Sequence, residues 1–336
     1  MNSNFNCRLF HKIRFVSLNC FNIATTFQKS KFQFILQRKF SVTKSPLRMR
    51  FVQYRCLKEG PQRLGVQLAQ DDDIIDVSAV DSSIPNNLVQ FLEGGPNLLE
   101  KTKRIVAEGK SVSHLKNVEL LAPITKPDKV ICVGLNYKAH CDEQNKPYPE
   151  EPFFFNKFPS TIIGPNSIVK HPSNTQALDW EVELAVVIGK KARDISKNKA
   201  LDYVFGYTVA QDISARDWQK SRNNGQWLIG KSMDTFCPLG PAVVMKEYFG
   251  PPNDKAISCS VNGKVKQSAT TSDLIHGVED LIAYLSHCFT LLPGDVILTG
   301  TPSGVGMHRK PQEYLKAGDI IVSEISGIGQ LKNTVA

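Results

Sequence analysis

The most informative pattern of apolar and polar positions lies between residues 178 and 189, where the chain reads LDWEVELAVVIG. Successive side chains of a β-strand point to opposite faces, so residues two apart share a face. One face is then wholly apolar and consists of Trp180, Val182, Leu184, Val186 and Ile188. The other face begins with Glu181 and Glu183 and continues with Ala185 and Val187. The pattern predicts a strand that is buried on both faces and carries two carboxylates at its start.

Short apolar runs typical of strands recur along the rest of the chain, at residues 130–134, 204–210, 242–245, 257–261, 296–298 and 320–322. Helical spacing of apolar positions is clearest over residues 86–110 and 272–289. Strands that outnumber helices and do not alternate with them disfavour a Rossmann fold or an alternating α/β barrel. We therefore expect a mixed, β-rich α+β fold, built as a mixed β-roll or sandwich.

A junction containing two prolines, residues 120–127, divides this pattern into two parts. The shorter part combines a few strands with helical sequence, and the longer part contains every motif that carries chemistry. We expect a small N-terminal α/β domain over residues 48–122 and a catalytic domain over residues 126–336.

The N-terminal 40 residues differ from the rest in charge. They contain seven Lys and Arg but no Asp or Glu, and the first acidic residue of the chain is Glu59. A basic segment that is rich in Ser, Thr and Asn and lacks acids is typical of a mitochondrial transit peptide, although a disordered basic arm on a cytosolic protein would have a similar composition. The sequence therefore predicts that residues 1–40 direct the protein to the mitochondrial matrix.

Charge and hydropathy also exclude two classes of partner. The whole chain has 41 Lys and Arg against 32 Asp and Glu. Without the seven basic residues of 1–40, 34 bases face the same 32 acids, a net charge of +2. A net charge so close to zero over residues 41–336 does not favour nucleic-acid binding. No apolar run approaches the ~18 residues of a membrane span, so no membrane insertion is expected.

Three carboxylates form the candidate metal site. The Cα atoms of Glu181 and Glu183 would lie ~7 Å apart on one strand, so both side chains can reach one cation. A third carboxylate, Asp212, follows the strand-like run at 204–210. Buried carboxylates repel one another unless a counter-ion is present. Oxygen ligands without His or Cys favour Mg²⁺ or Mn²⁺, with Ca²⁺ as an alternative and zinc disfavoured. A solvated strand face would carry a similar Glu pair.

Two further motifs are candidates for catalysis. His140 and Glu143 are three residues apart, so they share one side of a short helix, where the carboxylate can orient the imidazole for general base work. An ordinary surface pair has the same spacing.

Residues 298–306 form a glycine-rich turn that can present backbone N–H groups to a carboxylate. This turn lacks the Gly-Lys-Thr ending of a phosphate-binding loop, so nucleotide binding is not expected.

Taken together and in this order, these motifs resemble the fumarylacetoacetate hydrolase family. The resemblance covers residues 126–336. It rests on VGLNY at 133–137 with His140 and Glu143, WEVEL at 180–184, QDISARD at 211–217, GK at 230–231 and GTPSGVG at 300–306. Within the family, residues 48–122 and the run 234–241 look closest to a mitochondrial subgroup. Leu135 departs from the pattern, because some relatives have Arg at that position.

The resemblance implies a fold, a site and a chemistry. It implies a mixed β-roll that dimerises, with Mg²⁺ or Mn²⁺ bound by Glu181, Glu183 and Asp212. Lys231 would face the metal and the substrate, and His140 and Glu143 would form a dyad on a lid. Positions near the substrate would be Lys157, Arg216, Gln219 and Thr301.

The same resemblance implies that the substrate is a small 2-oxo acid or 1,3-dicarbonyl compound that reacts through a metal-stabilised enolate. For the mitochondrial subgroup it points to keto–enol tautomerisation of oxaloacetate. Hydrolysis of a C–C bond, as in acylpyruvases and fumarylacetoacetases, and decarboxylation of oxaloacetate start from the same enolate and stay open. The alternative outside the enzymes is a non-catalytic structural homologue.

Overall fold

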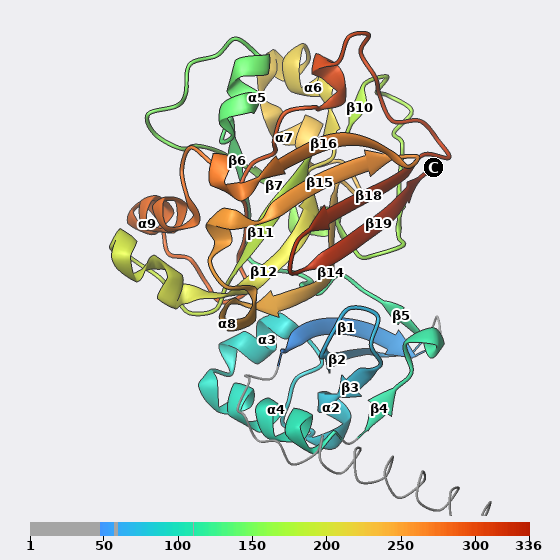
Figure 1. Ribbon diagram of the computed structural model, residues 1–336, viewed down its shortest axis with the longest axis vertical. Helices are drawn as coiled ribbons and strands as arrows, with labels where there is room; N and C mark the ends of the chain where they lie inside the picture. Colours follow the sequence, from blue (N-terminus) through green and yellow to red (C-terminus); the bar gives the residue numbers. More distant parts are fainter. Residues whose placement is uncertain (1–47, 57–59, 110) are drawn as a thin grey trace, which may run out of the picture. The chain divides into compact units, whose positions relative to one another are not determined.

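The computed structural model describes residues 48–56, 60–109 and 111–336 (Figure 1). The predicted transit peptide, residues 1–40, lies outside the described residues. The described residues belong to one compact unit. Within the described part of the chain, no helix is long and apolar enough to cross a membrane.

The largest element of the described chain is a mixed sheet of twelve strands. They are β1 (Arg50–Cys56), β2 (Gln62–Gln67), β3 (Ile74–Asp76), β4 (Val112–Ser113), β5 (Val118–Leu120), β6 (Val130–Gly134), β7 (Phe153–Lys157), β8 (Ile162–Ile163), β11 (Val182–Ile188), β12 (Val204–Gln211), β14 (Cys237–Met245) and β17 (Val296–Leu298). Ten of them follow the order β4-β3-β2-β1-β14-β12-β11-β17-β6-β7, while β5 pairs with β1 and β8 with β14. Most neighbours are antiparallel, but β17 and β6 run parallel.

A second sheet of five strands packs near the first. Its members are β9 (Ile168–Val169), β15 (Ala256–Val261), β16 (Lys264–Thr270), β18 (Ile320–Ile325) and β19 (Gly329–Val335). Their order is β16-β15-β18-β19-β9. A small two-stranded ladder joins β10 (Leu178–Asp179) to β13 (Ser214–Ala215). This β-rich α+β architecture confirms the fold class that the sequence predicts.

Strand β11 is buried on both faces, as its alternation predicts. The residues of its wholly apolar face, together with Trp180 just before it, belong to a core shared with Ile257 and Ile321 of the five-stranded sheet. Ala185 and Val187, on the opposite face, belong to a second core with Phe51 and Phe91. The period of two along this segment therefore sorts its side chains between two different hydrophobic cores.

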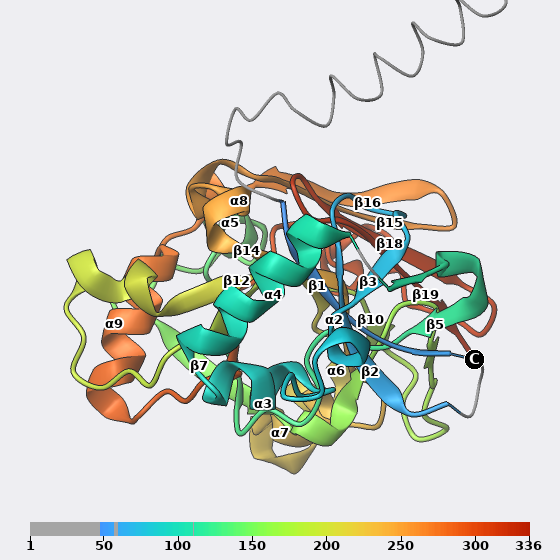
Figure 2. The same ribbon diagram turned by 90° about the horizontal axis from the view of Figure 1, so that it is seen from below.

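The helices are short. They are α2 (Val77–Val80), α3 (Leu88–Glu93), α4 (Pro96–Glu108), α5 (Lys138–Glu143), α6 (Arg216–Lys220), α7 (Trp227–Lys231), α8 (Lys246–Phe249) and α9 (Val278–Cys288). Helices α3 and α4 lie alongside the β1–β3 part of the large sheet (Figures 1 and 2), and their apolar residues join the second core. The stretch 86–110, expected to be helical, is thus two helices divided at Gly94 and Gly95.

The helix expected over residues 272–289 is shorter than predicted. A 3₁₀ turn occupies Thr271–Asp273, and α9 begins at Val278. The intervening residues bond to a distant part of the chain instead, because Ile275 N donates to the backbone oxygen of Asn136 and His276 N to its side chain. These long-range bonds replace the helical ones, and the spacing of apolar residues contains no sign of them.

The two predicted domains share one sheet. Strand β1 of the shorter part pairs with β14 of the longer part, with Arg50 opposite Val244 and Phe51 opposite Val243. The division into residues 48–122 and 126–336 stays a prediction. The sheet continuity indicates that the shorter part extends the main core.

Candidate metal and substrate site

Three carboxylates meet where β11 begins and β12 ends. The two strands are antiparallel neighbours, with Val182 opposite Gln211, so the residues just outside this pair lie side by side. Asp212 N donates to the backbone oxygen of Glu181 at 2.9 Å. One carboxylate oxygen from each of Glu181, Glu183 and Asp212 lies within 4.8 Å of the other two. The strand register therefore assembles the three metal ligands that the sequence predicts; their ligand role stays a prediction.

These carboxylates are deeply buried. The exposed fraction is 5% for Glu181, 1% for Glu183 and 0% for Asp212. Buried anions at such short separation are costly unless cations compensate them. The surrounding side chains show how far the protein itself provides that compensation.

Two lysines neutralise Asp212. Lys157, at the end of β7, donates to Asp212 Oδ1 at 2.6 Å and to the backbone oxygen of Ile213 at 3.1 Å. Lys231, at the end of α7, donates to Asp212 Oδ2 at 2.7 Å and to Glu181 Oε2 at 2.6 Å. Burial alone would lower the pKa of Lys231, but Asp212 and Glu181 outweigh it and raise that pKa above its ordinary value. Lys231 is therefore a protonated, fully buried ammonium.

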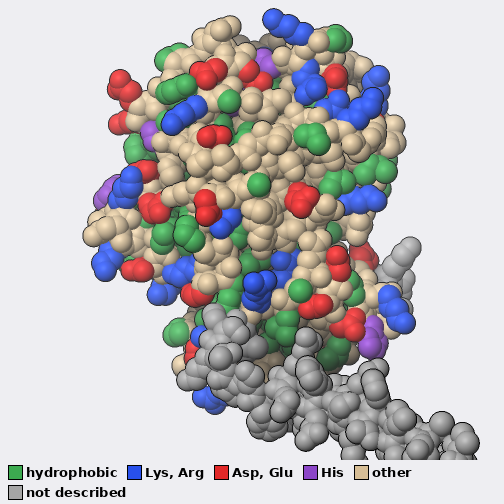
Figure 3. All heavy atoms as spheres, in the orientation of Figure 1, with side chains coloured by type: hydrophobic (Ala, Val, Ile, Leu, Met, Phe, Trp, Pro, Cys, Tyr) green, Lys and Arg blue, Asp and Glu red, His purple; other side chains and the backbone are tan. Residues whose placement is uncertain are grey.

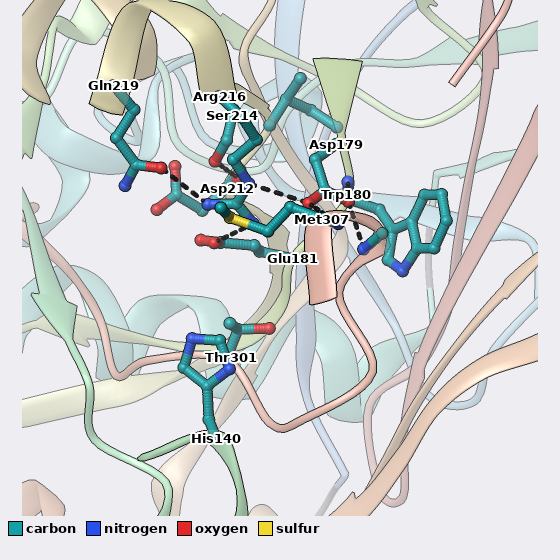
Figure 4. Close-up of polar contacts among 12 residues, drawn as sticks. His140, Asp179, Trp180, Glu181, Asp212, Ser214, Arg216, Gln219, Thr301 and Met307 are labelled. Atoms are coloured by element: carbon teal, nitrogen blue, oxygen red, sulfur yellow. Dashed lines mark hydrogen bonds and ion pairs between the residues drawn. The ribbon is translucent and has the colours of Figure 1, made fainter. Parts of the chain in front are cut away.

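Arg216 neutralises the other side of the cluster. Its Nε donates to Asp179 Oδ2 at 2.8 Å, its Nη1 to Gln219 Oε1 at 2.9 Å, and its Nη2 lies 2.6 Å from Glu181 Oε1 (Figure 4). Burial would raise the pKa of Glu181, but Arg216 and then Lys231 hold it well below its ordinary value. Glu181 is thus an ionised carboxylate with a cation on each oxygen.

Glu183 is the carboxylate that the described side chains leave uncompensated. Its Oε2 accepts a hydrogen bond from Gly300 N at 2.6 Å, and no described Lys, Arg or His lies within ion-pair distance of it. Burial, followed by the negative charges of Asp212 and Glu181, raises the pKa of Glu183 well above its ordinary value. With all four carboxyl groups ionised, Asp179, Glu181, Glu183 and Asp212 face only Lys157, Arg216 and Lys231, which leaves one negative charge in excess. The raised pKa of Glu183 reflects the cost of holding that charge without a cation.

This excess charge and the donor set both fit a small divalent cation. The residues that would hold it are Glu181, Glu183 and Asp212, which provide carboxylate oxygens alone. Hard cations such as Mg²⁺ and Mn²⁺ select such ligands. The uncompensated charge on Glu183 indicates that the protein by itself does not complete the site.

The predicted dyad lies on helix α5. His140 Nδ1 is 2.6 Å from Glu143 Oε1, and Glu143 Oε2 accepts a hydrogen bond from Gly304 N at 3.0 Å. The second ring nitrogen of His140, Nε2, is 2.9 Å from the side-chain nitrogen of Gln144. The dyad is therefore attached on one side to the glycine-rich turn and on the other to its own helix.

Asp179 organises the end of the glycine-rich turn. Its carboxylate accepts hydrogen bonds from Gly306 N at 2.7 Å, Met307 N at 3.0 Å and Trp180 N at 2.9 Å, in addition to that from Arg216. A Cβ atom at residue 306 would lie 1.9 Å from the backbone oxygen of Glu313, so glycine is required for this close approach. The turn binds carboxylates, as its sequence suggests, but these carboxylates belong to the protein.

A small cavity, about 30 Å³ in volume, opens beside this cluster. Of the predicted site residues, it is lined by His140, Glu181, Glu183, Arg216, Gln219, Lys231 and Thr301. Glu143, Lys157 and Asp212 are not among the lining residues, and Lys157 contacts Asp212. The contacts of Lys157 therefore favour a supporting role, and its predicted contact with substrate stays a prediction.

Val133, Gly134 and Leu135 of the VGLNY motif also line this cavity. It is further lined by six residues that sequence reasoning missed: Gln144, Phe155, Lys220, Trp227, Met307 and His308. Phe155 and Trp227 hold Lys231, whose Nζ lies 4.9 Å and 6.0 Å from their ring centroids. Among these residues, only Gln144 could have been identified from the sequence, because it follows His140 by four residues, the spacing of neighbours on a helix. The others converge from separate strands and turns.

Lys220 lies at the outer part of the cavity. The residue as a whole is exposed, and its Nζ is 5.3 Å from the ring centroid of Trp227. Partial burial of the amino group, followed by the positive charges of Lys146 and Arg216, lowers the pKa of Lys220 to about 8. The entrance of the cavity is therefore cationic near neutral pH.

Comparison with known proteins gives the same family as the motifs. Residues 129–336 match the family model described as the C-terminal region of fumarylacetoacetate hydrolase. The chain is 47% identical to "Oxaloacetate tautomerase fahd2, mitochondrial" of Xenopus laevis, over 88% of this chain and 93% of that protein. It is 49% identical to "Oxaloacetate tautomerase FAHD2A, mitochondrial" of Homo sapiens, over 85% of this chain and 91% of that one.

Solved structures agree. A fumarylacetoacetate hydrolase from Exiguobacterium antarcticum superposes with a TM-score of 0.74 at 36% identity, covering 85% of this chain and 99% of that chain. A maleylpyruvate hydrolase from Sphingobium superposes with a TM-score of 0.70 at 29% identity, covering 86% and 99%. The names of the two relatives place them in mitochondria, which confirms the location expected from the basic N-terminal segment. By sequence, motifs and fold, the chain belongs to the fumarylacetoacetate hydrolase family.

Proposed function

We propose that this protein is a metal-dependent oxaloacetate tautomerase that converts enol-oxaloacetate to keto-oxaloacetate in the mitochondrial matrix. Two relatives that share nearly half of its residues are named oxaloacetate tautomerases. The observation that carries the proposal is the buried cluster of Glu181, Glu183 and Asp212, which lines or adjoins one small cavity and has an uncompensated negative charge.

Mg²⁺ or Mn²⁺ is the proposed cofactor, with Ca²⁺ as an alternative, and the three carboxylates are its proposed ligands. When bound, such a cation would polarise the 2-oxo and carboxylate oxygens of the substrate, which stabilises the enolate and makes the enol hydroxyl a stronger acid. The polar lining of the cavity, with Arg216, Gln219 and Lys231, suits a small anionic 2-oxo acid or 1,3-dicarbonyl compound.

Arg216, Gln219 and Thr301 are the proposed substrate-positioning residues. Each is held by its own hydrogen bonds: Arg216 by Asp179, Gln219 by Arg216, and Thr301 by Gln267 at 2.8 Å and by the backbone oxygen of Val182 at 3.0 Å. Side chains held in this way can orient a substrate without losing further conformational freedom. They also place positive charge and hydrogen-bond donors beside an anionic substrate.

Lys231 is the proposed proton donor. An ammonium group has three N–H bonds, and Asp212 and Glu181 use two of them, so one remains on the side that lines the cavity. Tautomerisation requires delivery of one proton to carbon C3 and loss of one from the enol oxygen. The buried ammonium provides the first, the acidic enol hydroxyl loses its proton to solvent, and Lys231 regains a proton from solvent, so no proton is gained or lost overall.

Hydrolysis of a C–C bond is the second candidate, because the His140–Glu143 dyad has the geometry of a general base and would be needed to activate water. Decarboxylation starts from the same substrate and needs no such base. A non-catalytic structural protein is disfavoured, because the carboxylate cluster, Lys231 and the dyad are all present. Homodimerisation stays a proposal based on the family.

Acidic and basic side chains are interspersed on the face shown in Figure 3. This distribution, together with the near-neutral body of the chain, supports a small molecule as the partner in place of nucleic acid.

The test is an absorbance assay of enol-oxaloacetate with the full-length protein, first with Mg²⁺ and then with EDTA. We expect rapid, metal-dependent loss of the enol and no release of pyruvate. Release of pyruvate from acetylpyruvate would favour the hydrolase, and release of CO₂ from oxaloacetate the decarboxylase. Absence of turnover in every assay would refute the enzyme proposal.

A further inference from the structure

Gln144 contacts the catalytic dyad in a way that the family resemblance does not describe. The residue follows the last residue of α5 and lines the cavity. Its side-chain nitrogen is 2.9 Å from His140 Nε2 and 3.2 Å from the backbone oxygen of His140. One amide group therefore contacts both the ring and the main chain of the residue four positions earlier.

These two contacts determine which ring nitrogen of His140 holds the proton. A backbone oxygen accepts hydrogen bonds and never donates them, so the atom of Gln144 beside it must be the amide nitrogen. That nitrogen is a donor only, and it also faces His140 Nε2. Nε2 must then be the acceptor, with a free lone pair, and the proton of the neutral ring lies on Nδ1.

The other side of the ring agrees with this assignment. Nδ1 lies 2.6 Å from Glu143 Oε1, where an N–H group donates to a carboxylate. Glu143 is itself fixed through Oε2 by Gly304 N at 3.0 Å. The imidazole is thus oriented as a general base requires, with its basic nitrogen at Nε2.

That basic nitrogen is occupied. A water molecule that attacks a carbonyl carbon must give a proton to a base within hydrogen-bond distance. At His140 this position is taken by the amide of Gln144. The ring of His308 further restricts the approach, since it lies edge-on to His140 with 6.3 Å between the ring centroids.

We propose that Gln144 is a specificity-determining residue that caps His140 Nε2 and thereby suppresses C–C hydrolysis in favour of tautomerisation. The inference rests on the proposed tautomerase function and deepens it. An enol hydroxyl is a much stronger acid than water, so tautomerisation tolerates a capped imidazole, whereas water activation does not. The dyad is complete, and its hydrolytic use is blocked by one hydrogen bond.

The suppressed reaction is fully defined for acetylpyruvate. Water adds to the acetyl carbonyl carbon while its proton passes to His140 Nε2. The bond between that carbon and C3 then breaks, and its electron pair stays on C3 as the enolate of pyruvate. Protonation of C3 completes the reaction, so acetylpyruvate and water give acetate and pyruvate, with no other reactant.

The experiment compares the native protein with Gln144→Leu, which has similar size but no hydrogen bond. The readout is the ratio of acetylpyruvate hydrolysis to enol-oxaloacetate tautomerisation, measured in each protein with Mg²⁺. We expect this ratio to rise at least tenfold. The double variant Gln144→Leu with His140→Gln should lose the gain, because no basic nitrogen remains there. Gln144→Asn, one methylene shorter but still polar, serves as a second variant if Gln144→Leu does not fold.

A spectroscopic measurement tests the same hydrogen bond without turnover. Nitrogen NMR of histidine-labelled protein should show His140 Nε2 as an unprotonated, hydrogen-bonded nitrogen in the native protein, and its resonance should shift in Gln144→Leu. A protonated Nε2 in the native protein, or an unchanged ratio in a folded variant, would overturn the proposal. If the native protein tautomerises no enol-oxaloacetate but the variant gains hydrolysis, the cap stands and the proposed function fails.

Discussion

The two halves of the site are built by different kinds of contact. The carboxylate half, made of Glu181, Glu183 and Asp212, lies on β11 and β12 and is held by cations from distant parts of the chain. The dyad half consists of His140 and Glu143 on α5 and of Gln144 just after that helix. It is held by contacts three and four residues apart and by one long-range hydrogen bond, from Gly304 N to Glu143. Removal of one partner from a buried long-range ion pair strongly destabilises the protein, whereas contacts between residues close in sequence can rearrange. We therefore expect the carboxylate half to be rigid and the dyad half to be more adjustable.

The largest effect is expected at the uncompensated carboxylate. Glu183→Gln should lower the tautomerase kcat/KM by about 10³-fold or more, because the variant removes a charged ligand of the proposed cation. In EDTA the same variant should melt at the same temperature as the native protein or higher, since a buried repulsion is relieved. Kinetics and thermal melts with and without Mg²⁺ provide the measurement.

Stabilisation by Mg²⁺ should be lost in Glu183→Gln and kept in Glu119→Gln, a matched change in an exposed ion pair with Arg55. An equal response of the two variants to Mg²⁺ would contradict the assignment of the carboxylate half.

A smaller loss of activity but a larger loss of stability is expected for Lys231→Met. Removal of the ammonium leaves Glu181 and Asp212 buried without their shared partner, which costs about 3–5 kcal/mol of the free energy of unfolding. Loss of the proposed proton donor should lower kcat by about 10²–10³-fold. Urea unfolding and steady-state kinetics measure the two effects. A stable variant with native kcat would exclude Lys231 from both roles.

The dyad half should be less critical for the proposed reaction. His140→Asn removes the basic nitrogen, yet we expect tautomerase kcat to fall by only about tenfold or less, because the enol needs little base assistance. The free energy of unfolding should change by about 1 kcal/mol, since the hydrogen bonds that His140 makes are local and partly exposed. A fall in kcat as large as that of Lys231→Met would show that both halves take part in proton transfer.

The smallest effect concerns the entrance of the cavity. The pKa of Lys220 is lowered to about 8, mainly by burial and then by Lys146 and Arg216, while Glu181 raises it and Lys231 adds to the lowering. The ammonium is charged below that pH, so KM for the anionic substrate should rise about threefold as the pH passes through 8. In Lys220→Met, KM should be higher at pH 7 and independent of pH over this interval. A native protein whose KM is flat between pH 7 and 9 would exclude this contribution.

The fold class and the pair of faces on β11 could be predicted because both depend on local periodicity. The start of α9 could not, since Ile275 and His276 bond to Asn136, more than 130 positions earlier. The same reason explains the cavity lining. Phe155, Trp227 and His308 come from separate segments, and no spacing along the chain relates them.

The amino-acid sequence by itself determined that two glutamates on a doubly buried strand need a counter-charge, because a period of two and the cost of burying anions are local properties of that strand. It also placed His140 and Glu143 on one side of a short helix. Tertiary structure decided which cations reach which oxygen, and that Glu183 is left without one. It decided as well that His140 lines the same cavity as Glu181 and Glu183. The pairing of each cation with its carboxylate oxygen depends on the positions of β7, α6 and α7. These positions are set by packing between segments that are far apart in the sequence.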